Sequence, residues 1–241
     1  VPVGRVHYLP NGAISRRRGD GMHIRNQYGL GKVPIVLLYT RFFEFDVARA
    51  VETFGRILDR APDARFLVVG RALFNEADIR FDRLVAQSGL GERVLRAGWV
   101  LPEELPDYFA ASDLAIYPFD DTLINRCKCS VKLTDLLAAG VAVVADAVGQ
   151  NAEYITHGET GLLVPAGDIE AMADAAARLI RDDELRRSLG AAAARRVADQ
   201  YAWSKLAIIA LAAYAGEPSS PYSLRSRGSK SASESGTRGS I

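Results

Sequence analysis

The sequence predicts an α/β fold with a doubly wound parallel sheet, and three observations lead to this prediction. Short apolar runs without polar alternation recur along the chain, as in strands that are covered on both faces. Amphipathic stretches, with apolar residues three and four positions apart, separate these runs. The two kinds of segment alternate, and this βαβα order places ligands at the carboxyl ends of the strands.

The predicted elements follow one another from residue 33 to residue 215. Apolar, β-rich runs bounded by turn residues or charges predict strands over 33–39, 64–70, 94–100, 113–118, 141–145 and 161–165. Apolar residues at helical spacing predict helices over 45–58, 76–88, 101–111, 131–139, 168–182, 184–199 and 203–215. Gly140 ends the fourth of these helices, directly before a buried strand.

The two ends of the chain differ from this core. Residues 1–32 contain one short apolar run, a turn signal and a polar, glycine-rich stretch, which we expect to be a linker. Residues 33–215 form the predicted α/β domain. From residue 216 to residue 241, Ser, Gly, Arg and Lys dominate, which predicts a disordered tail. The chain begins in mid-pattern at Val1, and we expect it to be part of a longer protein.

Composition excludes several classes of protein. With 241 residues and 49% hydrophobic content, the chain can bury a substantial core. A net charge of +1 gives no support for binding nucleic acid or membranes through bulk charge. No run approaches the roughly 20 apolar residues of a membrane span, and no signal peptide opens the chain, so we expect a cytoplasmic protein. The two cysteines, Cys127 and Cys129, are too few for a zinc site and are expected to be reduced.

A lysine stands in the first turn of the helix predicted over 131–139. Ser130 is placed to cap this helix, and Lys132 then lies where the partial positive charge of the helix end disfavours a cation, unless an anion binds there. A helix N-terminus beside a lysine suits a phosphate group. A solvated lysine paired with Asp135 is the alternative that this stretch leaves open.

Seven short motifs occur between residues 9 and 164: LPNG, LLYTR, FLVVG, ASDLAIYP, KLTDLLAAGVAVVA, VGQNAEYI and GETGLLV. In this order they resemble the C-terminal, donor-binding half of the GT-B glycosyltransferases of family 4, and the resemblance covers about residues 6–215. It implies retaining transfer of a sugar from a nucleotide-diphosphate sugar to an acceptor hydroxyl. The reaction would take place in a cleft between two Rossmann-like domains, with no cofactor and no metal.

The resemblance also implies that residues 1–32 include the end of an N-terminal domain, and it implies the partners of the chain. These are the nucleotide-sugar donor, an unknown acceptor and the N-terminal domain of the same enzyme, which would shape the acceptor site. Any peripheral membrane contact would run through that domain. No nucleic-acid partner is expected, and this chain by itself would bind the donor but hardly turn it over.

Two cations are the residues to which the resemblance assigns catalysis. Arg41 follows the first strand, where the family has an arginine that faces the donor pyrophosphate and can hold two phosphate oxygens. The lysine that usually follows this arginine is absent, and Lys132 is its candidate replacement. Together the two cations would stabilise the departing diphosphate. A surface arginine paired with Glu44 is the alternative reading of Arg41.

The family also carries two glutamates separated by seven residues. The second, which binds the ribose hydroxyls, falls on Asp135, and the first, which approaches the sugar, falls on Cys127. A thiol cannot accept hydrogen bonds as a carboxylate does, so either Asn125 or Lys128 takes over the sugar contacts, or the activity is altered. The amides at Ser130 and Val131 would meet the phosphates.

The remaining donor contacts fall on two loops. Trp99 and Val100 stand where the family's backbone brackets the nucleobase, although a tryptophan in such a place is more often part of the core. Gly149 and Glu153 match a loop and an acid that meet the donor or the acceptor-side domain, and Glu153 also suits a helix start favoured by the dipole. Asp120 and Asp121 are expected to form an exposed turn rather than a metal site.

Two other functions remain open at this point. A GT-B sugar-nucleotide epimerase would act on the donor without an acceptor. A non-catalytic nucleotide-binding or interaction module would fit the thiol at Cys127 and the absent lysine. A dinucleotide oxidoreductase is disfavoured, because no G-x-G-x-x-G follows the first strand.

Overall fold

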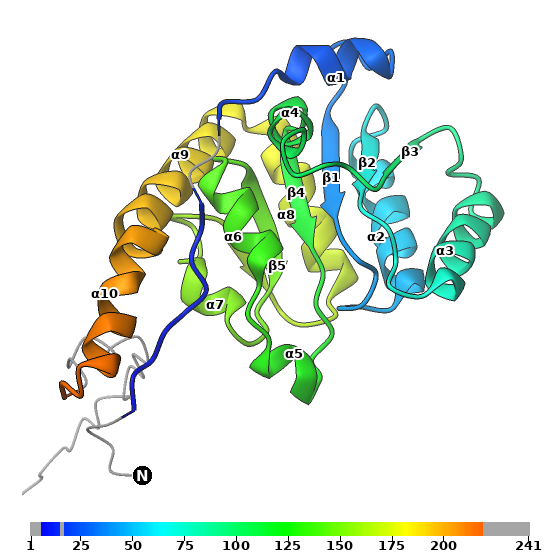
Figure 1. Ribbon diagram of the computed structural model, residues 1–241. Helices are drawn as coiled ribbons and strands as arrows, with labels where there is room; N and C mark the ends of the chain where they lie inside the picture. The colour runs from blue at the N-terminus through cyan, green and yellow to red at the C-terminus, as the bar shows by residue number, and fades with distance from the viewer. Residues whose placement is uncertain (1–5, 15–16, 219–241) are drawn as a thin grey trace, which may run out of the picture. The chain divides into compact units, whose positions relative to one another are not determined.

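A single parallel sheet lies at the centre of the computed structural model, which describes residues 6–14 and 17–218 (Figure 1). The strand order is β3-β2-β1-β4-β5-β6, and all neighbouring strands are parallel. The predicted doubly wound α/β fold is therefore confirmed. The strands are β1 (Ile35–Tyr39), β2 (Arg65–Val69), β3 (Val94–Gly98), β4 (Leu114–Tyr117), β5 (Ala142–Asp146) and β6 (Leu162–Val164).

Seven of the helices in the described part of the chain were predicted from apolar spacing. They are α2 (Val47–Arg60), α3 (Asn75–Gln87), α4 (Leu105–Ala111), α6 (Val131–Ala138), α8 (Ile169–Arg181), α9 (Asp183–Gln200) and α10 (Trp203–Tyr214). Three more were not predicted: α1 (Gly21–Gln27), α5 (Leu123–Cys127) and α7 (Asn151–Tyr154). These have 7, 5 and 4 residues, and none of them buries more than one apolar side chain, so no helical repeat of apolar residues marks them.

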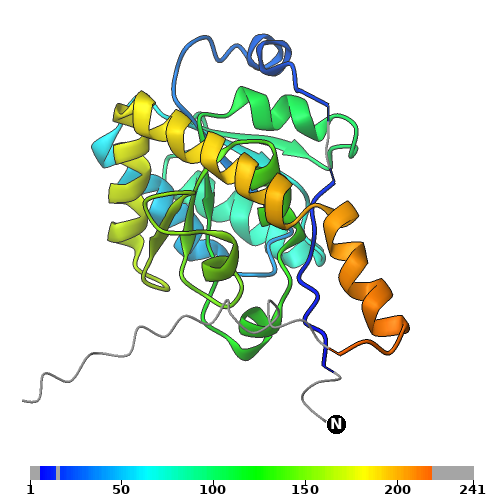
Figure 2. The same ribbon diagram turned by 90° about the vertical axis from the view of Figure 1, so that its left-hand side faces the viewer.

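The two faces of the sheet bury separate cores, with a layer of helices over each (Figures 1 and 2). Side chains alternate along each strand, so Val36 and Leu38 of β1 face α2, α3 and α8. Ile35 and Leu37 face the other way, towards α4, α6 and α9. In Figure 2, α9 crosses this second face in front of the sheet. Burial on both faces explains why the strands read as uninterrupted apolar runs.

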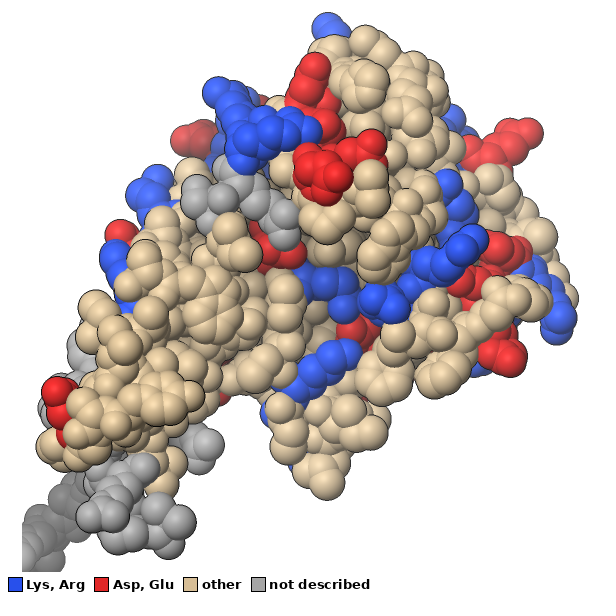
Figure 3. All heavy atoms as spheres, viewed as in Figure 1, with Lys and Arg blue, Asp and Glu red and all other residues tan. Residues whose placement is uncertain are grey.

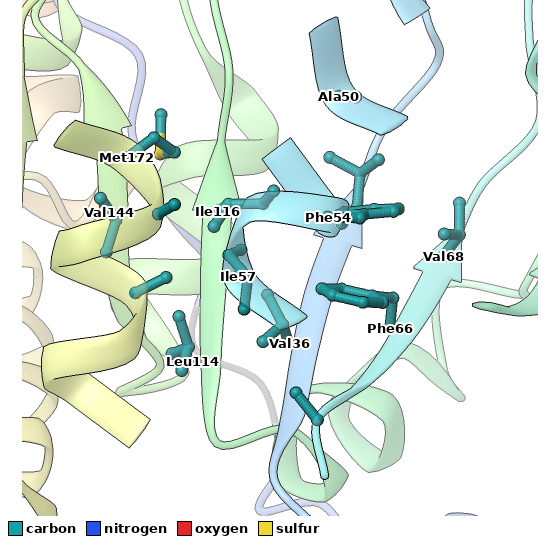
Figure 4. Packing of buried hydrophobic residues seen from close by; sticks show 14 of the residues in the cluster. Val36, Ala50, Phe54, Ile57, Phe66, Val68, Leu114, Ile116, Val144 and Met172 are labelled. Atoms are coloured by element: carbon teal, nitrogen blue, oxygen red, sulfur yellow. The ribbon is translucent and has the colours of Figure 1, made fainter. Parts of the chain in front are cut away.

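The first of these cores is shown from close by in Figure 4. Phe54 of α2 lies over Phe66 of β2, and their rings stack with centroids 4.1 Å apart. Ile57, one turn after Phe54, reaches Val36 of β1. Burying large side chains of this kind stabilises the fold by about 1.5–3 kcal/mol for each side chain.

The polar stretch that the sequence places in a linker belongs to a compact unit that spans Pro10–Leu206. Asp20 caps α1 by accepting hydrogen bonds from the amides of Met22 and His23. Arg25 of α1 pairs with Asp113, at 2.9 Å. Ile24 and Leu30 also join the core on one face of the sheet. Such isolated apolar residues among polar ones form no periodic pattern, so the composition did not distinguish this segment from a linker.

The other described residues, 6–9 and 207–218, belong to a second unit. Within it, Nε2 of His7 donates a hydrogen bond to the carbonyl of Glu217, over 3.1 Å. Residues 1–5, 15–16 and 219–241 lie outside the described residues, and nearly all of the predicted disordered tail is among them. None of the described helices is long and apolar enough to cross a membrane.

Candidate functional site

The carboxyl ends of β1 and β2 approach each other closely at Gly70. This glycine has a φ of +115°, and a Cβ added there would lie 1.9 Å from the carbonyl oxygen of Thr40. Only glycine fits such an approach. As a result, Arg41, the next residue after Thr40, is held at the end of β1 beside the end of β2.

A cavity of about 170 Å³, called the edge cavity below, opens at the carboxyl ends of β1, β2 and β3. It brings together four of the predicted site residues: Arg41 after β1, Trp99 and Val100 after β3, and Lys132 of α6. The rest of its lining is Tyr39, Thr40, Val69, Gly70, Pro102 and Leu105. Lys and Arg side chains form a band across the middle of the face of the molecule shown in Figure 3.

Trp99 is exposed, and the expectation that it is more often a core residue is wrong here. Its exposed fraction is 59%, because it follows β3, the edge strand of the sheet. The guanidinium carbon of Arg41 lies 5.2 Å from the centroid of its ring, which is a cation–π contact. Nε of Arg41 is buried without a hydrogen-bond partner. Arg41 is thus supported by Trp99 and not by Glu44, the partner in the alternative reading.

Glu44 is the residue of this site that sequence reasoning missed. Its exposed fraction is 2%, and its Oε1 accepts hydrogen bonds from Nζ of Lys128 over 2.7 Å and from Nζ of Lys132 over 2.9 Å. Burial by itself would raise the pKa of Glu44, but the two ammonium groups outweigh it and hold the pKa below its ordinary value. Lys132 therefore pairs with a carboxylate 88 positions away, and the expected alternative pair with Asp135 is not the one formed.

The start of α6 lacks a side-chain cap. Ser130 occupies the N-cap position, as predicted, but its hydroxyl does not bond to the amides of the first turn. Instead, Oγ of Ser130 lies 3.1 Å from the hydroxyl of the buried Tyr117. Val131, the first residue of α6, is exposed. The amides of Val131 and Lys132 are thus available to an anion, beside the ammonium groups of Lys128 and Lys132.

Asn125 and Gly149 fix the loop that leads from β4 to α6. The side-chain amide nitrogen of Asn125, which is buried, donates to the carbonyls of Glu44 over 2.7 Å and of Asp120 over 2.8 Å. Gly149 has a φ of +51°, and a Cβ there would lie 2.8 Å from the carbonyl oxygen of Asn125. Of the two residues predicted to replace the sugar-binding carboxylate, Lys128 is the one whose charged group joins the cations. The amide of Asn125 bonds to backbone.

Two exposed thiols flank Lys128. Cys127 ends α5 and Cys129 lies two residues later, and both are free. The position at which the resemblance expects a glutamate is therefore at the surface, next to Lys128.

Asp135 lies one turn after Lys132 on α6 but lines a different, larger cavity of about 540 Å³ between α1, α4 and α6. Leu105 borders the edge cavity and Pro106, the next residue of α4, borders the larger one. The two cavities thus follow adjoining stretches of α4 and α6. Glu153, on α7, lines neither of them.

The acidic pair after β4 is engaged by arginines. Asp120 pairs with Arg49 over 2.8 Å, and Asp121 pairs with Arg126 over 2.6 Å. Among the residues that the structure describes, no three His, Cys, Asp or Glu side chains come together as a metal ion would need.

Comparison with known proteins identifies the family of the chain. A family model described as Glycosyl transferases group 1 matches residues 34–182, a segment that contains the whole lining of the edge cavity. The chain belongs to the group 1 glycosyltransferases. The predicted family and its GT-B type of fold are thereby confirmed.

Two curated relatives show how much of the chain is shared. The GDP-mannose-dependent alpha-(1-6)-phosphatidylinositol monomannoside mannosyltransferase of Mycobacterium tuberculosis is 28% identical over 213 residues, which cover 86% of this chain and 54% of the relative. Alpha-D-kanosaminyltransferase of Streptomyces kanamyceticus is 30% identical over 215 residues, which cover 85% and 52%. The chain thus spans about half the length of these curated relatives.

Solved structures show the same fold. Sucrose-phosphate synthase from Thermosynechococcus elongatus has a TM-score of 0.71 at 28% identity, over 86% of this chain and 51% of that one. HepE from Anabaena, in complex with UDP and glucose, has a TM-score of 0.71 at 18% identity, over 86% and 56%. The C-terminal domain of a group 1 family glycosyl transferase from Francisella tularensis has a TM-score of 0.57 at 22% identity, over 81% and 97%.

Proposed function

We propose that this chain binds the nucleotide-diphosphate sugar donor of a glycosyltransferase that transfers the sugar to an acceptor hydroxyl with retention of configuration. The observation that supports the proposal most is the convergence of Arg41 and Lys132 on one cavity, beside the uncapped start of α6. An N-terminal domain of the same protein would supply the acceptor site, which accords with relatives that are about twice as long.

In the proposed reaction, Arg41 and Lys132 stabilise the leaving group. When the bond between the anomeric carbon and the diphosphate breaks, negative charge develops on the phosphate oxygens. A guanidinium, an ammonium and the amides of a helix start are preorganised donors for that charge. Lys128 and Lys132 share the one carboxylate of Glu44, and Arg41 lies on the ring of Trp99, so the site stays positively charged for an anionic ligand.

The acceptor oxygen forms its bond to the anomeric carbon on the face from which the diphosphate departs. The proton of the acceptor hydroxyl passes to an oxygen of the leaving phosphate, so this route needs no carboxylate base. The thiol at Cys127 therefore does not block it. In this proposal Lys128, whose ammonium group lies at the site, takes over contacts to the sugar.

The nucleoside would lie along α4 and α6. Trp99 and Val100 offer an exposed ring and an apolar wall for a base. Asp135, in the adjoining cavity, is the candidate for the ribose hydroxyls. The roles of Gly149 and Glu153 towards the donor or the acceptor-side domain stay predictions. A cytoplasmic location also stays a prediction, and the two free thiols suit a reducing compartment.

Replacement of the two cations tests the proposal. In a protein that contains both halves, Arg41→Ala and Lys132→Ala should each lower kcat about 100-fold, because each removes a group that stabilises the developing charge. Arg71→Ala is the matched control, because this exposed arginine follows the neighbouring strand β2 and does not line the edge cavity. Turnover within about threefold of the parent for both variants would contradict the proposal.

Product analysis in the same assay separates the competing functions. A new nucleotide-sugar without a glycoside would identify an epimerase. Nucleotide binding without any release of nucleoside diphosphate would identify a non-catalytic module.

A further inference from the structure

Two lysines from different segments share one carboxylate oxygen. Lys128 precedes α6 and Lys132 is on it, and both ammonium groups bond to Oε1 of Glu44, over 2.7 and 2.9 Å. The two nitrogens are therefore less than about 6 Å apart, a distance at which like charges repel appreciably. Without an anion between them, the side chains would separate into solvent.

The loop around Glu44 is built to hold this carboxylate still. Phe42 has a φ of +51°, a left-handed conformation that bulky residues rarely adopt, and its amide donates to Oγ1 of Thr40. Oε2 of Glu44 accepts a hydrogen bond from the amide of Phe43, over 3.3 Å. The carbonyl of Glu44 accepts from Asn125 and from the amide of Asp120. The carboxylate is thus fixed by backbone and side chain at once.

Lys128 is held from a second side as well. Its ammonium nitrogen lies 4.7 Å from the centroid of the Phe43 ring, directly before Glu44 in the chain. The side chains of Lys128 and Lys132 are 28% and 17% exposed, so both are partly withdrawn from water. The pair is therefore preorganised by the loop 42–44 and does not depend on a ligand.

We propose that Glu44 is a positioning residue that holds Lys128 and Lys132 together, so that they meet the diphosphate of the donor as a preformed pair. The inference rests on the proposed function and adds a residue to it. Preorganised groups bind more tightly, because the ordering of two long side chains does not have to accompany ligand binding. Removal of Glu44 leaves both lysines in the chain but no longer aligned.

Two other roles for Glu44 predict different behaviour. If Glu44 only stabilised the loop, its loss would not change what Lys132 contributes to anion binding. If Glu44 competed with the phosphates for the lysines, its loss would make the contribution of Lys132 larger. A positioning role makes that contribution smaller. The coupling between residues 44 and 132 therefore separates the three roles.

The experiment is a double-mutant cycle read by calorimetry. Wild type, Glu44→Gln, Lys132→Ala and the double variant are titrated with UDP, GDP, ADP and inorganic pyrophosphate, with thermal unfolding as the check that each is folded. Lys132→Ala should weaken the best ligand about tenfold in the parent and less than about threefold in the Glu44→Gln background. Asp78→Asn is the matched control, a buried acid that pairs with Arg96 and does not line the edge cavity. In that background the tenfold effect should persist.

Every outcome decides between the two proposals. Binding of pyrophosphate with the expected coupling, but without added affinity from any nucleoside, supports the role of Glu44 and contradicts the proposed function. Nucleotide binding in which Lys132→Ala has an equal or larger effect in the Glu44→Gln background supports the function and overturns the role of Glu44. Absence of binding to every anion by folded wild type overturns both.

Discussion

At the scale of single residues, the cations of this site contact partners that are far away in the sequence, an aromatic ring in one case and a carboxylate in the other. Arg41 stacks on the ring of Trp99, and its Nε remains without a hydrogen-bond partner. Lys128 and Lys132 are tied to the carboxylate of Glu44. An arginine on an aromatic face keeps its bonding groups for a ligand, whereas a lysine in an ion pair is fixed in place.

The ionisation of Glu44 makes the stability of the fold depend on pH. Because its pKa is lowered from the ordinary 4.5, it stabilises the folded state above pH 4.5, and this stability is lost as the pH falls through the folded pKa. Glu44→Gln should therefore lower the free energy of unfolding at pH 7 by about 2 kcal/mol, since the two lysines can partly turn to solvent. It should also flatten the loss of stability below pH 4.5, in urea unfolding followed by circular dichroism.

Asp146 is the matched control for this prediction. It is fully buried at the end of β5, and burial raises its pKa from the ordinary 3.8 despite the pairing with Arg49. The contribution of Asp146 to the stability of the fold is complete below pH 3.8 and is lost as the pH rises through the folded pKa. This pH dependence is opposite to that of Glu44. If Glu44→Gln left the acid limb of the stability curve unchanged, the ionised pair would not be the source of that stability.

The residues of the site differ in how far the sequence indicated them. Lys132 was predicted because its place in the first turn of a helix is a local signal, and Arg41 was assigned through the resemblance. Both line the edge cavity. Glu44 was missed, since no spacing in the chain connects residue 44 with residues 128 and 132. The exposure of Trp99 was also missed, because a short apolar run does not reveal that its strand lies at the edge of the sheet.

At the scale of elements, the site is formed where the ends of strands lie next to the start of a helix. The carboxyl ends of β1, β2 and β3 and the start of α6 border the edge cavity, and the diversion of Ser130 to Tyr117 leaves that helix start uncapped. Strands and long helices were predicted within about two residues of their observed bounds, because the apolar pattern extends along the whole of each element. The short helices α1, α5 and α7 bury too few apolar side chains to show a helical repeat, so the sequence did not indicate them.

Substitution of Gly70 tests the close approach of β1 and β2. Gly70→Ala should destabilise the fold by about 3 kcal/mol, because the alanine must accept a positive φ and also displace the carbonyl of Thr40. Gly89→Ala is the matched control: its φ of +68° carries the same backbone strain, but nothing lies within 4 Å of the added Cβ. It should cost about 1 kcal/mol.

The readout for this pair is the midpoint of chemical unfolding together with nucleotide affinity. Gly70→Ala should also weaken nucleotide binding, since it moves the segment that carries Arg41, whereas Gly89→Ala should not. Equal losses of stability for the two variants would mean that the contact with Thr40 has no energetic consequence.

At the scale of the whole molecule, alternating strands and helices were sufficient to predict the parallel sheet and its two covered faces. The extent of the compact unit was less accessible. The unit begins at Pro10, whereas the sequence set the start of the domain at residue 33, because the intervening segment is held by a few isolated buried residues, such as Ile24 and Leu30, and by polar contacts, such as the pair between Arg25 and Asp113. Apolar periodicity identifies neither isolated buried residues nor ion pairs.

The fold also explains why residues so far apart in the sequence act together. In a doubly wound sheet, the loops that follow neighbouring strands gather at one edge, and the strand order reverses between β1 and β4. The loop that carries Arg41 and Glu44 follows β1, and the segment that carries Lys128 and Lys132 follows β4. The two segments that supply the cations thus flank the point of reversal.

The most direct test of the central claim is a crystal structure of this chain with the nucleoside diphosphate that it binds best among UDP, GDP and ADP. We predict diphosphate oxygens within about 3 Å of the ammonium group of Lys132 and of the first amides of α6, with the guanidinium of Arg41 on the same group. Phosphates bound elsewhere, for example beside Arg17 and Arg18 in the larger cavity, would contradict the account.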